Sequence, residues 1–188
     1  MISVPVNKVI PDLTQLKRKL HVQSEREEKL LQLVIDEFKL LVDPRYSYKR
    51  VKMNEQPLLG LINSSKDLKE CLKGVEEGFV VIATLYGAVI PQEAGIALYA
   101  DRVLSDMTED LAEFTAKELI SKFYTDKDTL TRRYSPGYGD LSLKRQKEIF
   151  SLFADAELDV RLTGQFYMQP EKSVSYIVGI KKNEGRSK

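Results

Sequence analysis

Between residues 131 and 139 the chain reads "TRRYSPGYG", which gathers side chains suited to ligand binding into one short loop. The planar guanidinium of Arg132 or Arg133 can bind a carboxylate through two parallel hydrogen bonds. The ring of Tyr134 or Tyr138 can stack on a flat group or face a cation. The nearby glycines let main-chain groups approach a ligand closely. These residue types indicate small-molecule recognition, although their spacing alone favours a rigid Pro-Gly turn with solvated arginines.

A second candidate lies in the acidic segment "SDMTEDLAEFTAKEL", residues 105–119. Its apolar spacing predicts a helix, on which Glu109 and Glu113 are neighbours because they are four residues apart. A carboxylate on that face could bind an amino group. The same charge density is typical of a solvated helical face, and the segment alone favours that interpretation.

Several kinds of site have no support in the sequence. Neither GxGxxG nor GxxxxGK[ST] occurs, which argues against a phosphate loop. His21 and Cys71 are the only residues of their types, so a zinc site or an activated thiol is not expected. A net charge of +1 gives no argument for nucleic acid or an anionic membrane as partner.

Cysteine content and apolar patterning bear on the compartment. A single cysteine allows no disulfide within the chain, which favours an intracellular, cytoplasmic location. The N-terminus lacks the pattern of a signal peptide. The longest apolar run, residues 79–90, is too short to span a bilayer as a helix.

Periodicity predicts an α+β domain with a mixed or antiparallel sheet packed against several helices. A single domain is expected over residues 1–182, followed by a polar tail at 183–188. Helices are predicted at 12–20, 24–42 (with a Ser24/Glu27 capping box), 64–74, 92–123 and 142–157, and strands at 46–53, 57–63, 79–85, 160–168 and 173–182.

The order of two motifs resembles a known family. "RYSPGY", a helix of about 20 residues and then "LTxxxxMxPxxSVS" are similar to the activation domain of cobalamin-dependent methionine synthase. The likeness covers residues 78–180, and "VVIATLYGAVIPQ" and "LAEFTAKEL" extend it upstream of the loop. "GDLSLKRQ" after Tyr138 departs from the pattern of methionine synthase itself and looks more like small stand-alone members of the family.

The resemblance implies S-adenosylmethionine as ligand. By the match, Arg133 would bind its carboxylate, the main chain of Ser135 its polar edge, and Tyr138 would lie beside it. Glu113, or Glu109 one turn away, would bind the amino group. No residue of the chain is assigned as a catalytic group or metal ligand, because the methyl chemistry belongs to the ligand and to cobalt.

The resemblance also implies partners and a role. The chain would support reductive remethylation of cob(II)alamin held by a partner methionine synthase subunit or corrinoid protein, with an electron donor such as flavodoxin. An alternative is a docking or structural module of a corrinoid methyltransferase complex that has lost the ligand, which Gly164 favours because it replaces the family's usual acidic residue. An independent methyltransferase is disfavoured, because no His or Cys lies near the loop to act as a general base.

Overall fold

The computed structural model describes residues 1–183, so the predicted polar tail lies, apart from Asn183, outside the described residues. The strands are β1 (Ile2–Ser3), β2 (Asp43–Lys52), β3 (Glu77–Tyr86), β4 (Thr129–Leu130), β5 (Arg161–Leu162), β6 (Met168–Gln169) and β7 (Ser173–Lys181). The α-helices are α1 (Leu13–Lys19), α2 (Glu25–Leu41), α3 (Leu58–Asn63), α4 (Lys66–Cys71), α5 (Ala94–Phe123) and α6 (Gln146–Ser151). Two 3-10 helices, η1 (Val6–Lys8) and η2 (Leu143–Arg145), complete the described part.

One antiparallel sheet organises the molecule, with strand order β1-β2-β3-β7-β4. The three long strands β2, β3 and β7 form its centre, and the short strands lie at its edges. A separate hairpin, β5-β6, precedes β7. The predicted α+β class with an antiparallel sheet is therefore confirmed.

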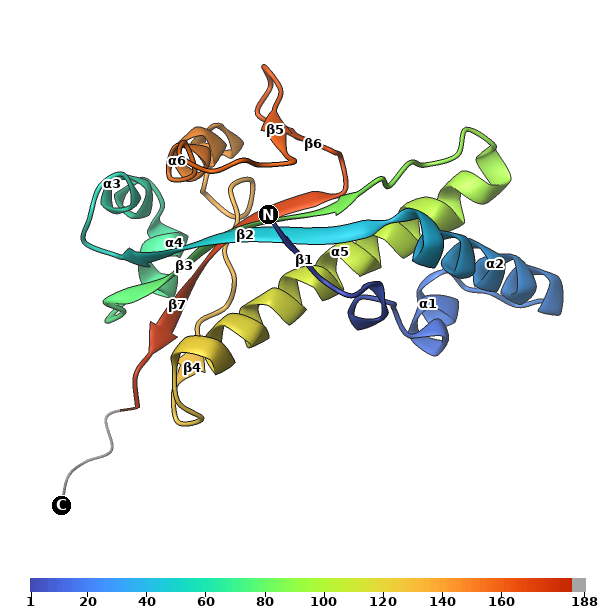
Figure 1. Cartoon of the computed structure of the whole chain (residues 1–188), viewed down its shortest axis with the longest axis horizontal. Helices are drawn as coiled ribbons and strands as arrows, with labels where there is room; N and C mark the ends of the chain where they lie inside the picture. The colour runs from blue at the N-terminus through green and yellow to red at the C-terminus, as the bar shows by residue number, and fades with distance from the viewer. Residues whose placement is uncertain (184–188) are drawn as a thin grey trace.

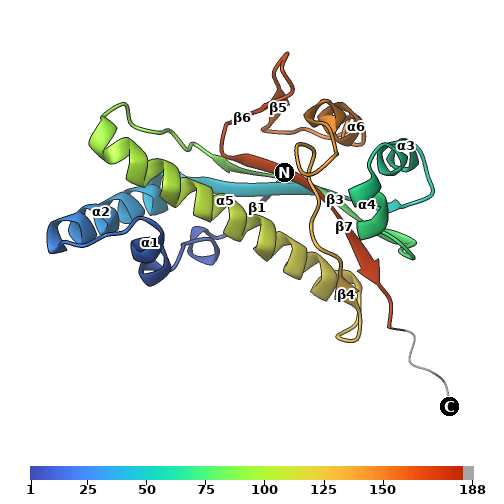
Figure 2. The same ribbon diagram turned by 180° about the vertical axis from the view of Figure 1, so that it is seen from behind.

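Helices cover both faces of the sheet (Figures 1 and 2). The long helix α5 crosses one face together with α1 and α2, whereas α3, α4, α6 and the β5-β6 hairpin lie on the other. Strand β3 supplies both layers, since Phe79, Val81 and Ala83 pack on the α5 side while Val80 and Ile82 pack on the opposite side. All five are fully buried, which explains why this strand reads as an unbroken apolar run.

Local sequence signals account for most helix boundaries. Ser24 and Glu27 form the expected capping box at the start of α2. Asp12 accepts a hydrogen bond from the amide of Gln15 and so caps α1. Ser65 caps α4 in the same way. These caps are local hydrogen bonds, so short sequence patterns predict them well.

Several predicted elements differ in the structure. Residues 57–63 form helix α3 rather than a strand, because Leu58, Leu61 and Ile62 lie on one helical face and pack into the layer of α4 and α6. A short apolar run does not by itself distinguish the two periods. Residues 160–168 contain only the two-residue strand β5 and the start of β6, and the predicted helix at 142–157 is shortened to η2 and α6. Among the described residues, no helix combines the length and apolarity needed to cross a membrane.

Gly78 and Gly179 form a paired position on β3 and β7 where no side chain fits. A methyl group on Gly78 would meet the Val178 carbonyl oxygen, the Gly179 Cα at 2.9 Å and the Met53 methyl at 2.6 Å. Two of these three obstacles are backbone atoms, which cannot rotate away.

We expect Gly78→Ala to lower the free energy of unfolding by about 3 kcal/mol, the upper part of the range for overpacking a core. Gly164→Ala is the matched control, because a Cβ there meets nothing within 4 Å. Urea denaturation of both variants measures the difference. Equal stability of the two variants would contradict the conclusion that the space at the Gly78–Gly179 pair excludes a side chain.

Candidate functional site

An extended segment between β4 and the loop fixes the position of Arg133. The Thr131 amide donates to the Gly179 carbonyl oxygen at 2.9 Å. Tyr134 and Ile177 then exchange both main-chain hydrogen bonds, at 2.9 and 2.8 Å. Successive side chains of an extended segment point to opposite faces. Tyr134 therefore packs in the α4 and α6 layer, while Arg133 reaches α5.

The loop then turns back through two left-handed glycines. Gly137 has φ +96°, and its amide donates to the Leu141 carbonyl oxygen at 2.8 Å. Gly139 has φ +51°, and a Cβ there would meet the Asp67 carboxylate and the Tyr134 hydroxyl. Both positions favour glycine for its conformational freedom. The turn leaves the Tyr138 side chain 67% exposed at the loop tip.

The second half of the loop is attached to the neighbouring helix layer. The Asp140 carboxylate accepts hydrogen bonds from the Ser65 hydroxyl and, at 2.7 Å, from the Lys66 amide at the start of α4. These hydrogen bonds, that from Ser65 first, lower the pKa of Asp140. Farther along, the buried Gln146 side chain accepts a hydrogen bond from the Ser175 hydroxyl at 2.7 Å. "GDLSLKRQ" is therefore a structural anchor that holds the loop between α4 and β7.

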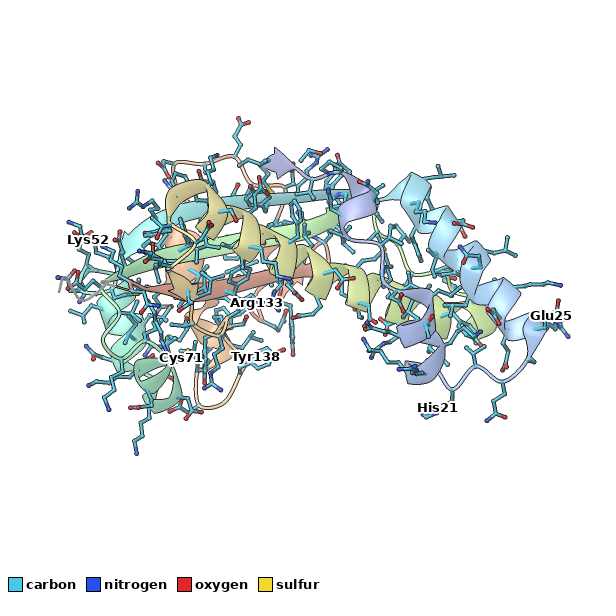
Figure 3. The ribbon with its side chains drawn as sticks, turned by 90° about the horizontal axis from the view of Figure 1, so that it is seen from below. His21, Glu25, Lys52, Cys71, Arg133 and Tyr138 are labelled. Carbon is cyan, nitrogen blue, oxygen red and sulfur yellow. The ribbon has the colours of Figure 1, made fainter. Side chains whose placement is uncertain are left out.

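A pocket of about 160 Å³ lies between this loop, α5 and β7. Its lining residues are Glu109, Ala112, Arg133, Ser135, Tyr138, Val174 and Tyr176. Figure 3 shows Arg133 and Tyr138 close together beside α5, far from His21 and Glu25 at the other end of the molecule. The structure thus brings three of the predicted site residues together in one pocket, with Glu109 as the carboxylate beside them.

The two terminal nitrogens of Arg133 differ in their hydrogen bonds. Its Nη2 donates to Glu109 across the pocket. Its Nη1 is buried and has no hydrogen-bond partner among the described residues. A buried guanidinium nitrogen without an acceptor is costly, and the donors of Nη1 suit an acceptor such as a carboxylate. Arg132, the other candidate, is exposed and does not line the pocket. Its guanidinium carbon lies 5.2 Å from the centre of the Tyr134 ring.

Tyr176 forms the floor beneath Arg133. The guanidinium carbon lies 5.8 Å from the centre of its ring. The Tyr176 hydroxyl is 2.8 Å from the Thr115 hydroxyl and donates to the Ala112 carbonyl oxygen at 3.2 Å. Burial raises the pKa of Tyr176 to about 12, so the hydroxyl stays neutral and offers no negative charge to Arg133.

Glu113 lies one helical turn from Glu109 and does not line this pocket. Its carboxylate is paired with Lys117, which lowers the pKa of Glu113; the charge of Arg133 contributes further. Glu113 instead lines a second pocket of about 410 Å³ between α5 and the N-terminal segment, and Glu109 borders both pockets. Of the two carboxylates considered from the sequence, Glu109 is the one in contact with Arg133.

Sequence reasoning did not single out Val174 and Tyr176. Ser173 and Ser175 share one face of the strand predicted at 173–182, and the period of two places Val174 and Tyr176 on the other face. Only the register with Tyr134 shows that this other face borders the loop. The pairing of the edge segment ends at Ile177, so within residues 1–183 no strand pairs with the edge of β7 at Ser175 on the loop side.

The described residues hold no group of three or more His, Cys, Asp and Glu arranged for a metal ion. The chemistry of the pocket is that of one cation, one carboxylate, an exposed aromatic ring and main-chain groups. This combination suits a zwitterion, because Arg133 offers donors to a carboxylate and Glu109 accepts from an ammonium group.

Comparison with solved structures identifies the fold. The chain superposes on the crystal structure of the MetH reactivation domain bound to AdoHcy, with a TM-score of 0.59 over 95% of this chain and 77% of that chain. The chain shares the fold of that domain. Sequence identity is 13%, so the likeness concerns architecture. Neither a protein-family model nor a curated protein sequence matches the chain.

The attachment of the loop through Asp140 predicts a dependence of stability on pH. Because the folded-state pKa of Asp140 is lowered, its contribution is complete above the unfolded value of about 3.9 and is lost as pH falls through the folded value. Asp140→Asn should therefore be less stable than the parent at pH 7, and the difference should shrink below about pH 4.

Urea denaturation at a series of pH values measures this difference. Asp126→Asn is the control, since Asp126 is exposed and hydrogen-bonded to no other described residue. A constant difference between Asp140→Asn and the parent down to pH 2 would show that the ionised carboxylate does not hold the loop.

Proposed function

We propose that this chain binds S-adenosylmethionine, and its product S-adenosylhomocysteine, through their common amino-acid end. The observation that carries the proposal is that Arg133 and Glu109 line one pocket, while the buried Nη1 of Arg133 has no hydrogen-bond partner in the described part of the chain. The shared fold with a domain that holds AdoHcy supports it.

The pocket dimensions limit which part of the ligand it can enclose. A pocket of about 160 Å³ is smaller than the roughly 300–1,000 Å³ of pockets that enclose most of a drug-sized ligand. That space fits an amino-acid end, and the adenosyl part would extend outside it. Tyr138, largely exposed at the mouth, offers a ring for contact with the extended part.

Each lining residue has a role in this proposal. Nη1 of Arg133 donates to the ligand carboxylate, and Glu109 accepts from the ligand amino group. Main-chain groups of Ser135 bind the polar edge. Arg133 and Glu109 are paired with each other. The zwitterion would add one negative charge beside the arginine and one positive charge beside the glutamate, so its binding adds no net charge to the pocket.

The proposed role of the bound ligand is methyl donation to a cobalamin held by a partner, a methionine synthase subunit or related corrinoid protein. The carbon–sulfur bond breaks, its electron pair stays on sulfur, and S-adenosylhomocysteine remains. An electron donor such as flavodoxin supplies the one electron needed to start from cob(II)alamin. The chain itself contributes position and charge complementarity.

Isothermal titration with S-adenosylmethionine and S-adenosylhomocysteine tests the ligand. We expect binding by the parent, and a loss of about 2 kcal/mol in Arg133→Ala, the size typical of a hydrogen bond to a charged group. Arg132→Ala is the control because Arg132 lies outside the pocket. A parent that binds neither ligand at millimolar concentration, tested with and without a cobalamin protein, would contradict the proposal and favour the ligand-free docking module.

Glu109 and Glu113 provide a second, matched comparison on one helix. Glu109→Gln should weaken S-adenosylhomocysteine binding about tenfold, because a neutral amide is a poorer acceptor for an ammonium group. Glu113→Gln should change it little, since Glu113 is paired with Lys117. The reverse ranking would assign the amino group to Glu113.

The partner requires its own experiment. When a cobalamin-binding methionine synthase module in the cob(II)alamin state is mixed with the chain, reduced flavodoxin and S-adenosylmethionine, we expect the absorption spectrum of methylcobalamin to appear. Replacing the chain with Arg133→Ala should slow its appearance at limiting ligand. Formation of methylcobalamin at the same rate without the chain would contradict this role. Ligand binding would then still be tested by the titration.

A further inference from the structure

The guanidinium of Arg133 is held from two directions, and neither uses Nη1. Glu109 binds Nη2 from α5. The ring of Tyr176 lies on a second side, with its centre 5.8 Å from the guanidinium carbon. An aromatic face attracts a cation through its quadrupole and leaves the N–H groups free to bond to an acceptor elsewhere. Nη1 is buried, and no residue within 1–183 accepts a hydrogen bond from it.

Tyr176 is itself immobilised from both ends. Its backbone belongs to β7, where it pairs with Val81 of the central strand β3. Its hydroxyl is held at α5, where it lies 2.8 Å from the Thr115 hydroxyl and donates to the Ala112 carbonyl oxygen at 3.2 Å. The side chain is 1% exposed. The ring therefore spans the space between sheet and helix, with little freedom to turn away from Arg133.

The alternative role for Tyr176 is simple filling of the core. Tyr46 gives the comparison, because it is equally buried in the same apolar layer and does not line the pocket. Both tyrosines contribute buried area, but of the two only Tyr176 contacts the guanidinium of Arg133, and only Tyr176 lines the same pocket as Arg133. The two roles can thus be separated by measuring whether a Tyr176 substitution weakens binding only of a ligand that carries a carboxylate.

We propose that Tyr176 is a positioning residue, whose ring holds Arg133 so that Nη1 is presented to the carboxylate of a ligand's amino-acid end. This inference rests on the proposed function for the identity of the ligand. It adds that recognition of the carboxylate depends on a residue that makes no hydrogen bond to it.

The first test compares two ligands that differ only in the carboxylate. S-Adenosylhomocysteine and its decarboxylated form, S-adenosyl-3-thiopropylamine, are titrated into the parent, Tyr176→Leu and Tyr176→Phe. Tyr176→Leu should weaken S-adenosylhomocysteine about tenfold, a change of about 1.4 kcal/mol, which is within the range of a desolvated cation–π contact. Its effect on the decarboxylated ligand should be less than threefold. Tyr176→Phe keeps the ring and should bind both ligands within threefold of the parent.

Three outcomes would overturn the inference. Equal losses for both ligands in Tyr176→Leu would mean that the side chain only shapes the pocket. A loss in Tyr176→Phe as large as in Tyr176→Leu would assign the effect to the hydroxyl. A carboxylate-specific loss of the same size in Tyr46→Leu would assign it to general damage of the core. Tyr176→Met serves as a second variant without a ring if Tyr176→Leu fails to unfold cooperatively.

The second test needs no ligand. In nitrogen-15-labelled parent protein, the Nε–H signal of Arg133, assigned by its absence in Arg133→Lys, should show the ring-current shift of a proton near an aromatic face. The shift should persist in Tyr176→Phe and in Tyr46→Leu, and it should vanish in Tyr176→Leu. A signal unchanged in Tyr176→Leu overturns the positioning role. Failure of the parent to bind either ligand would instead contradict the proposed function, and this signal would still decide whether Tyr176 holds Arg133.

Discussion

The paired main-chain hydrogen bonds between Tyr134 and Ile177 set the geometry on which the candidate site depends. They fix the register of the edge segment against β7, and register decides which side chain points to which layer. A shift of one residue would turn Arg133 away from α5 and bring Tyr134 into its place. The pocket exists because this register places the loop arginine and Tyr176 of β7 on the same face of the sheet.

Successive side chains of strand β7 point alternately to the two helical layers on either side of the sheet. Ser175 faces the α6 side, where its hydroxyl binds Gln146, while Tyr176 faces the α5 side and reaches Thr115. One strand thereby ties the structural half of the loop to one layer and the pocket-lining half to the other. The polar atoms involved are buried and mutually hydrogen-bonded, so each bond gives a defined position as well as stability. This arrangement gives a physical reason why the "RYSPGY" and "SVS" motifs occur together.

Features of the fold carried by local chemistry were predictable from the sequence. The capping box of Ser24 and Glu27, the long helix α5 and the buried strand β3 all follow from patterns within about 30 residues. Residues 57–63 were assigned wrongly because their short apolar run fits either period, and packing against α4 and α6 decides in favour of a helix. The order of the two motifs pointed to the architecture, which the comparison of structures confirms.

The site was predictable only in part. Its loop residues lie close together in the sequence, so Arg133 and Tyr138 could be named directly. The choice between Glu109 and Glu113 depends on how α5 is rotated about its axis. One turn of helix separates the two glutamates. A sequence pattern does not predict which of these turns lies beside a loop about 20 residues away in the chain. Tyr176 was missed for a related reason, since its position beneath Arg133 results from a pairing between distant segments.

The chemistry of the pocket requires arginine at position 133. A lysine ammonium carries its three donors on one nitrogen and would be drawn toward Glu109, so it could not place a second donor on a separate nitrogen. The guanidinium divides its donors: Nη2 is used by Glu109, the flat face is adjacent to Tyr176, and Nη1 remains. A cation can thus be neutralised by a protein carboxylate and still have a donor for a ligand carboxylate. A zwitterionic ligand fits this arrangement better than a simple anion, because its ammonium group compensates Glu109 at the moment its carboxylate takes the free donor.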